Sequence, residues 1–207
     1  MNNVGLLYVG AVLFVNGLML LGHVPARSAA VLNLFVGALQ CVVPTVMLIQ
    51  AHGDAAATLG ASGLYLFGFT YLYVGIVNLA GLEPEGLGWF CLFVCVAAIV
   101  YSLLSFTRSG DPVFGVIWLS WAVLWFLFFL VLGLGREELT RFTGWAVTLL
   151  SVPTCSVPAF LALTAHYQST SVIALGWALG LAVLLAVAKL LSSSAHRPTV
   201  SAQPIYR

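Results

Sequence analysis

The sequence carries very little charge. Of its 207 residues, 7 are Lys or Arg and 6 are Asp or Glu, so only 6% of the chain is charged. Soluble domains average about 25% charged residues, and nucleic-acid-binding proteins need a basic surface as well. A hydrophobic content of 62% and a mean hydropathy of +1.10 are instead typical of a polytopic membrane protein. We therefore expect a chain embedded in a lipid bilayer, with no nucleic-acid partner.

The residue patterns of common catalytic and metal sites are missing as well. The chain has no recognisable Ser/His/Asp set, no Gly-rich phosphate loop and no cluster of residues spaced as metal ligands. Its four cysteines fall in apolar segments, and no His or carboxylate in the same segment joins the helically spaced Cys91 and Cys95. We interpret all four as buried thiols. We expect no enzyme activity, no metal site and no cofactor.

Long apolar runs dominate what is present, and a helix needs about 20 such residues to cross a bilayer. Seven runs are long enough, and they cover residues 4–21, 29–51, 60–80, 86–106, 112–134, 142–165 and 172–191. These runs predict an all-α membrane bundle in which residues 1–191 form one transmembrane domain. Residues 192–207 are polar and are expected to form a disordered tail. No basic residue precedes the first run, which argues against a cleavable signal peptide.

The few cations indicate an orientation. With the N-terminus outside and seven spans, six cations fall in inner loops or the tail: Arg27, Arg136, Arg141, Lys189, Arg197 and Arg207. Arg108 alone then falls outside. Because cytoplasmic loops are enriched in Lys and Arg, this distribution predicts an outer N-terminus and a cytoplasmic C-terminus. Six spans would place the tail cations outside, so the seventh span is favoured.

No Asp, Glu, Lys or Arg lies near the centre of any predicted span. Ion-coupled transporters usually keep an ionisable group at membrane depth. The absence favours passive movement of a neutral solute, although it fits a purely structural membrane protein equally well.

Three tryptophans lie inside the fifth run, within the segment WLSWAVLW. At about 100° per residue, Trp118, Trp121 and Trp125 share an arc of about 60°. Tryptophan normally gathers at the membrane boundary, where its N–H stays hydrated. A stripe at membrane depth is either a helix-packing face or the wall of a narrow path for a flat polar solute.

With the N-terminus outside, the first, third and fifth spans run in the same direction, so their residues can be compared by depth. The first span contributes Val9, Leu13 and Asn16 on one side, and the third contributes Phe69 and Tyr73 at helical spacing. Together with the tryptophans they would form layers about 5 Å apart. Such a slot suits a planar neutral amide or urea, which can stack between rings. The Tyr73 hydroxyl, the Asn16 amide and the indole N–H groups could supply hydrogen bonds, or Asn16 could simply bond a neighbouring helix.

Five ordered motifs resemble the UreI/AmiS family of bacterial urea and short-chain amide channels. They are LLYVGAVLFVNG (6–17), AVLNLFVGAL (30–39), LFGFTYLYVGIVN (66–78), IWLSWAVLWFLFF (117–129) and FTGWAV (142–147). The resemblance implies a six-helix protomer with its own pore, a hexameric ring and a place in the bacterial cytoplasmic membrane. Carried onto this sequence, it implies a pore lined by Leu6, Val9, Leu13, Asn16, Phe69, Tyr73, Trp118, Trp121, Leu124 and Trp125.

The chain also departs from the urea-channel pattern. Phe114, Asn2 and Leu150 stand where the urea channels have Trp, Leu and an acidic residue, which leaves room for amides longer than urea. The outer loops are short and poor in His and carboxylates, so acid gating is not expected. The seventh span goes beyond the six-helix pattern and favours the amide branch of the family. Two functions remain open: a passive channel for urea and short aliphatic amides, or a non-conducting membrane sensor or assembly subunit that binds them.

Overall fold

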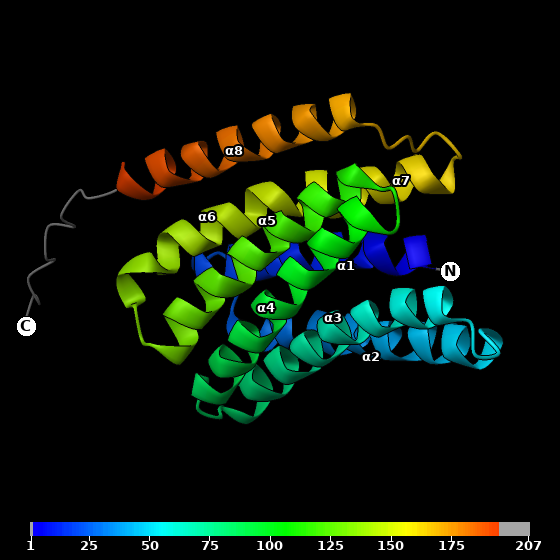
Figure 1. The fold of residues 1–207 in the computed structure, drawn as a ribbon. Helices are drawn as coiled ribbons and strands as arrows, with labels where there is room; N and C mark the ends of the chain where they lie inside the picture. The colour runs from blue at the N-terminus through cyan, green and yellow to red at the C-terminus, as the bar shows by residue number, and fades with distance from the viewer. Residues whose placement is uncertain (1, 195–207) are drawn as a thin grey trace, which may run out of the picture.

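Helices run back and forth along one axis in the computed structural model, which describes residues 2–194 (Figure 1). The first four spans are α1 (Asn2–Leu20), α2 (Ala26–Gln50), α3 (Ala55–Ala80) and α4 (Glu85–Thr107). The fifth is α5 (Pro112–Phe128), which continues into a π-helical turn, η1 (Phe129–Gly133). A short 3-10 turn, η2 (Glu137–Leu139), leads into the sixth span, and α8 (Ser171–Ser193) is the seventh. Within the described residues, seven helical spans are long and apolar enough to cross a membrane, which confirms the predicted fold class.

Most span boundaries differ from the sequence prediction by a few residues, as the third and seventh spans illustrate. The third span begins at Ala55, five residues before the expected start, because the Asp54 carboxylate caps it by accepting the Ala57 N–H at 2.7 Å. The seventh span continues through Ser193, two residues beyond its expected end. Residues 195–207 of the expected tail lie outside the described residues, and the division at residue 191 stays a prediction.

The sixth span is interrupted by a π-helical turn. It consists of α6 (Thr140–Ser151), η3 (Val152–Ser156) and α7 (Val157–Leu163). Pro153 and Pro158 lack the N–H that a regular helix needs, so the backbone widens here instead of continuing as an α-helix. This turn places Thr154 in the protein interior.

Glycines let neighbouring spans approach closely. A Cβ built on Gly68 of α3 would lie 2.7 Å from the Cys41 sulfur of α2, and one on Gly17 of α1 would lie 2.7 Å from the Thr148 backbone N of α6. Side chains at these two positions would therefore force the helices apart. Small residues at such crossings are typical of membrane bundles, where close packing stabilises the helix contacts.

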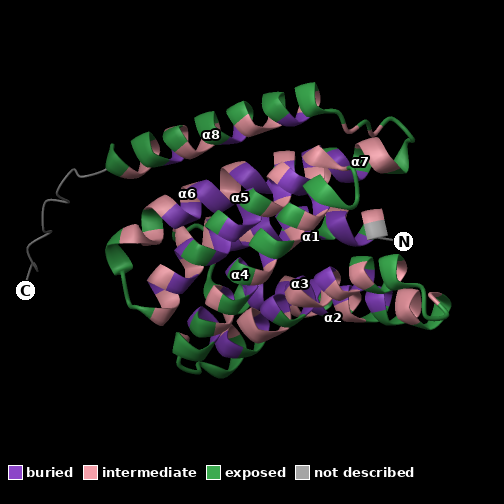
Figure 2. Cartoon of the chain, in the orientation of Figure 1, coloured by how far each residue is buried: buried purple, intermediate pink, exposed green. Residues whose placement is uncertain are grey.

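The seventh span lies on the outside of the bundle, against α5 and α6 (Figures 1 and 2). Ala174, Leu181 and Ala188 are buried in this contact, whereas the opposite side of α8 is exposed and apolar. No α8 residue lines either of the internal cavities described below.

Candidate solute pathway

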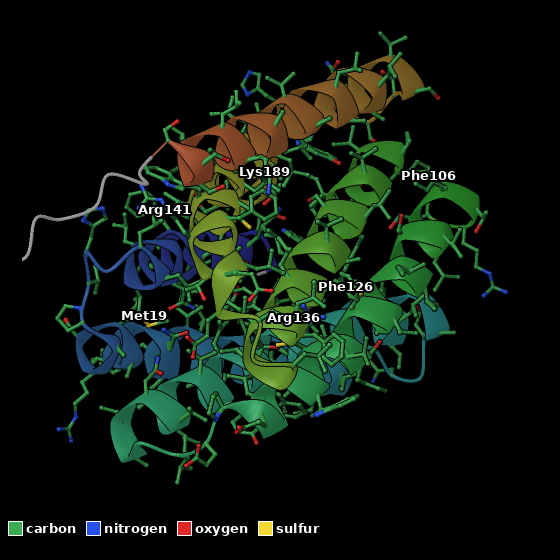
Figure 3. The ribbon with its side chains drawn as sticks, turned by 90° about the vertical axis from the view of Figure 1, so that its left-hand side faces the viewer. Met19, Phe106, Phe126, Arg136, Arg141 and Lys189 are labelled. Atoms are coloured by element: carbon green, nitrogen blue, oxygen red, sulfur yellow. The ribbon has the colours of Figure 1, made fainter. Side chains whose placement is uncertain are left out.

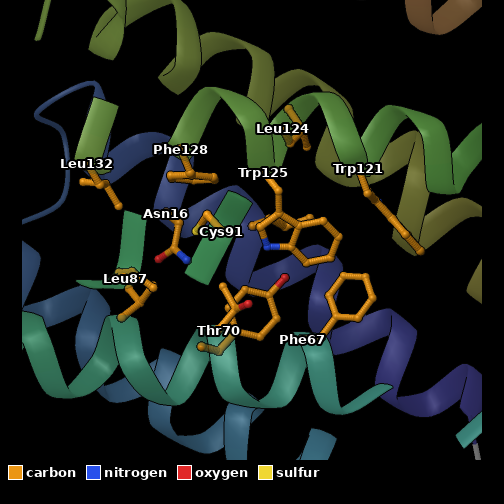
Figure 4. Close-up of a pocket in the computed structure, with 13 residues that line it drawn as sticks. Asn16, Phe67, Thr70, Leu87, Cys91, Trp121, Leu124, Trp125, Phe128 and Leu132 are labelled. Carbon is orange, nitrogen blue, oxygen red and sulfur yellow. The ribbon is translucent and has the colours of Figure 1, made fainter. Parts of the chain in front are cut away.

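Two cavities share a boundary inside the first five spans. The wide cavity has a volume of about 690 Å³ and includes residues at the end of the bundle that holds the N-terminus. Its lining includes Leu6, Val9, Gln40, Gly60, Phe67, Tyr101, Arg108, Asp111, Trp118 and Trp121. The narrow cavity has a volume of about 30 Å³ and continues toward the start of α4. Its lining is Leu13, Asn16, Phe67, Thr70, Tyr71, Val74, Leu87, Cys91, Trp121, Leu124, Trp125, Phe128 and Leu132 (Figure 4).

Phe67 of α3 and Trp121 of α5 line both cavities and form the partition between them. Their ring centroids are 4.9 Å apart and the rings are nearly perpendicular, at 82°. Trp125 contacts the same phenyl ring, also at 4.9 Å. Edge-to-face contacts of this kind hold aromatic rings in defined orientations. A solute that moves from one cavity to the other must therefore pass between aromatic rings.

Trp118 forms part of the wall of the wide cavity. It stacks on Tyr101 of α4 with centroids 4.7 Å apart and an angle of 19°, and the Tyr101 and Ser62 hydroxyls are hydrogen-bonded at 2.6 Å. Gly63 lies under the indole, where an added Cβ would come within 3.2 Å of the ring. The stripe thus packs helices together and also lines the two cavities, and its role as the wall of a solute path stays a prediction.

The π-helical turn of the sixth span fixes the orientation of Trp121. The indole N–H donates to the Thr154 hydroxyl at 3.1 Å, and that hydroxyl donates in turn to the Leu150 carbonyl at 2.6 Å. Thr154 is fully buried. The Trp121 N–H is therefore already satisfied inside the protein, and the expectation that it would be free to bind a solute is wrong.

Asn16 brings a polar group to the narrow cavity. Its amide pairs reciprocally with Asn33 of α2: Asn16 donates to Asn33 at 2.9 Å and Asn33 donates back at 2.7 Å. Asn33 uses its second N–H on the Ala29 carbonyl. An Asn amide has two N–H donors and two acceptor lone pairs. Asn16 thus bonds a neighbouring helix, as one interpretation held, and still keeps one donor and one acceptor position for a solute.

Eight of the ten residues predicted to line a pore also line these cavities. Leu6, Val9 and Trp118 line the wide cavity, Leu13, Asn16, Leu124 and Trp125 line the narrow one, and Trp121 lines both. Their role in conduction stays a prediction.

Phe69 and Tyr73 line neither cavity, and the expectation that they would face the tryptophans needs correction. Phe69 is 52% exposed, and the Tyr73 hydroxyl lies against Gly86 of α4. Phe67 and Tyr71, each 3% exposed, occupy the inward face instead. The segment FGFTYLY holds two aromatic pairs at the same spacing, and a shift of two residues turns the helix by about 200°. The sequence therefore could not say which pair faces inward.

The fourth span supplies lining residues that the sequence analysis missed. Leu87 and Cys91 of α4 line the narrow cavity. Their spacing of four residues places them on one helical face, but several apolar residues of α4 share such spacing. Gln40 was missed as well, although a glutamine in an apolar run is itself an unusual feature.

Charged groups are confined to the mouth of the wide cavity. Arg108 and Asp111 line it, whereas among residues 2–194 no Asp, Glu, Lys or Arg lines the narrow cavity. The Asp111 carboxylate accepts the Tyr167 hydroxyl at 2.8 Å, the Ser169 hydroxyl at 2.6 Å and the Phe114 N–H at 3.0 Å. Burial, together with the Asp111 carboxylate, raises the pKa of Tyr167 well above its ordinary value. These contacts hold the linker before α8 against the start of α5.

A multi-pass helical bundle with an internal aromatic passage is the architecture of a membrane transport protein. The chain belongs to the AmiS/UreI family of transporters, whose family model matches residues 1–166. The match covers the first six spans and ends before α8.

Named relatives agree with this assignment. The putative transporter protein AmiS2 of Rhodococcus erythropolis is 76% identical over 193 residues, covering 93% of this chain and 94% of the relative. The putative amidate substrates transporter protein of Mycolicibacterium smegmatis is 55% identical, covering 82% of this chain and 79% of the relative. The crystal structure of the Helicobacter pylori urea channel superposes with a TM-score of 0.73 at 33% identity, covering 81% of this chain and all of that one. The cryo-EM structure of that channel in its closed state gives a TM-score of 0.74 at 32% identity, with the same coverage.

Proposed function

We propose that this protein is a passive channel that conducts urea, acetamide and similar short aliphatic amides across the membrane through a pore in each protomer. The observation that carries the proposal is the pair of cavities that meet at Phe67 and Trp121, with no charged residue of the described part of the chain lining the narrow one. The names of the relatives, an amidate substrates transporter and an acid-activated urea channel, support the same substrate class. The protein has no catalytic role in this proposal.

The geometry accounts for selection of neutral amides. An ion entering the narrow cavity would lose its hydration shell without gaining compensating charges, which is costly in an apolar environment. A planar amide keeps most of its interactions, since its faces contact the Phe67, Trp121 and Trp125 rings. Asn16 offers its remaining N–H and lone pair to the carbonyl and amino groups of the solute. Asn33 holds that amide in place.

The proposed orientation places the N-terminus outside and the C-terminus in the bacterial cytoplasm. Arg136, Arg141 and Lys189 gather at the end of the bundle opposite the N-terminus (Figure 3), and Arg108 lies at the other end. The Lys189 ammonium lies 5.7 Å from the centre of the Phe142 ring, which lets it contact apolar surface near the membrane boundary. A reporter fused after Arg207 should therefore be active only in the cytoplasm.

Assembly is proposed to follow the hexameric ring implied by the family resemblance. Residues 1–191 would act as one transmembrane domain, followed by a cytoplasmic tail. Because α8 packs on α5 and α6 and lines neither cavity, its placement is compatible with a separate pore in every protomer. The mass of the purified complex measured in detergent would test the oligomer number.

Flux into proteoliposomes is the direct test. We expect labelled acetamide and urea to equilibrate faster than in empty vesicles, without accumulation and without response to sodium or membrane potential. Accumulation against a gradient would contradict a passive channel. Saturable amide binding without any flux would favour the sensor or assembly subunit instead.

A further inference from the structure

Gln40 of α2 is a buried polar side chain that the proposed mechanism has not used. It is 1% exposed and lines the wide cavity together with Leu6 and Val9 of α1. Its carbonyl oxygen, Oε1, has no hydrogen-bond partner among residues 2–194. It rests against Gly5, where an added Cβ would lie 2.6 Å away. A buried amide oxygen without a partner carries a free-energy cost, so its position calls for a functional explanation.

Most other buried polar side chains in the described spans are satisfied internally. Asn16 pairs with Asn33, Thr70 donates to a carbonyl of its own helix, and Thr154 bonds both Trp121 and Leu150. Thr143 is a buried exception, since its hydroxyl also has no partner in the described residues, but it lines neither cavity. Gln40 thus combines an unpaired buried amide oxygen with a place on a cavity wall.

The Asn16–Asn33 pair illustrates what such an amide can do. Two amides at hydrogen-bonding distance exchange one N–H···O bond in each direction, at 2.9 and 2.7 Å. A primary amide or urea carries the same donor and acceptor groups as the side chain of Asn or Gln. Rotation of the Gln40 amide by half a turn exchanges its oxygen and nitrogen positions, so it can present either group to the cavity.

We propose that the Gln40 side-chain amide is the first hydrogen-bonding partner of the solute, in the wide cavity, before the solute reaches the partition formed by Phe67 and Trp121. The inference rests on the proposed amide-channel function and adds a selective contact to it. The recognised class is primary amides and urea, which offer a carbonyl oxygen and an N–H on the same edge. Gln40 would donate its N–H to that carbonyl in one orientation of its amide and accept from that N–H in the other, so its burial is compensated only when such a solute is present.

Replacement of Gln40 by Met tests this contact, because Met has a similar length but no amide. Acetamide flux at low concentration should fall about fivefold, the effect of losing one neutral hydrogen bond. Osmotic water flux in the same vesicles should change less than twofold, because the cavity keeps its shape. Thr143→Val is the matched control, since it also removes an unpaired buried polar group, and it should leave both fluxes unchanged. Gln40→Leu provides a second apolar variant, and elution volume and thermal unfolding verify that each variant is assembled.

The possible outcomes are distinct. A selective loss of acetamide flux in the Gln40 variants supports the contact. Unchanged acetamide flux, or an equal fall in acetamide and water flux, overturns it while leaving the amide channel intact. If the unmodified protein conducts no amide at all, the proposed function fails, and this inference fails with it.

Discussion

The wide and narrow cavities divide the path into two regions with different chemistry. The wide cavity, at about 690 Å³, has Arg108, Asp111 and Gln40 in its wall. The narrow cavity, at about 30 Å³, is lined within the described spans by neutral residues alone, most of them aromatic or aliphatic. A site needs roughly 10–15 Å³ of such space to hold one water molecule. The wide region can therefore keep a solute hydrated, whereas the narrow one must strip it almost dry.

This difference indicates where selection takes place. In the wide cavity a charged or neutral solute can retain water, so discrimination there depends on single contacts. In the narrow cavity desolvation is nearly complete, and shape and hydrogen bonding act together. Variants at the partition and in the narrow cavity should consequently have larger effects than changes at the mouth.

The largest effect is expected from Trp121→Ala, because removal of the indole opens the partition between the two cavities. Discrimination between acetamide and butyramide in vesicle flux should fall about tenfold, because an apolar pocket that fits one chain length rejects longer ones by such factors. Removing this packed indole should also lower the free energy of unfolding by about 3–5 kcal/mol. Trp177→Ala, on α8 and away from both cavities, is the matched control. Unchanged discrimination in an assembled Trp121 variant would mean that the partition does not select.

The Asn16–Asn33 pair should have the next largest effect. Asn16→Leu leaves Asn33 buried with one donor and one acceptor unpaired, which costs about 1–3 kcal/mol of stability, and it removes the solute contact. Asn33→Leu should cost a similar stability but reduce acetamide flux less, since Asn16 remains at the cavity. Thermal unfolding and acetamide flux of both single variants and the double variant separate the two contributions. Equal flux losses in the two single variants would contradict a direct contact at Asn16.

Thr154→Val should produce a smaller change at the same partition. The substitution keeps the side-chain shape but removes the acceptor of the Trp121 N–H, so the unfolding free energy should fall by about 1–3 kcal/mol. The ring would then lose its fixed orientation, and acetamide selectivity should weaken less than in Trp121→Ala. Ser120→Ala is a suitable control, because the Ser120 hydroxyl donates only to Ile117 of its own helix. A Thr154 variant with unchanged stability and selectivity would show that this bond does not position the indole.

The fold was predictable because each span is a long apolar run, and such runs have few alternatives in a bilayer. The ends were less predictable, since a single cap at Asp54 lengthened α3 by five residues. Local signals of this kind are easily missed beside a hydropathy pattern.

The candidate site was predictable only where one helical face stood out. The Trp118–Trp125 stripe and the Val9, Leu13, Asn16 face are single patterns, and both reach the cavities. The third span offered two equivalent aromatic pairs, and only the packing of α3 against its neighbours distinguishes Phe67 and Tyr71 from Phe69 and Tyr73. Asn33 and Thr154 act through contacts between different spans: Asn33 bonds Asn16, 17 residues away, and Thr154 bonds Trp121, 33 residues away. No local sequence pattern encodes such contacts.

The smallest expected effect is that of pH. Flux should change less than twofold between about pH 5 and 8, where histidine is the side chain that ordinarily titrates. His23, His52 and His166 are exposed, and no histidine within residues 2–194 lines either cavity.

The contact between Tyr167 and Asp111 also persists through this range, because the raised pKa of Tyr167 keeps its hydroxyl protonated. The pKa of Tyr167 in the folded state exceeds its value of about 10 in the unfolded chain, so the contact contributes its full stabilisation of the fold below about pH 10. It is lost only as the pH rises above about 10. Stopped-flow acetamide uptake across a pH series tests the prediction, with thermal unfolding at each pH as the control. A steep rise in flux under acid conditions would contradict this prediction and show that a titrating group controls passage.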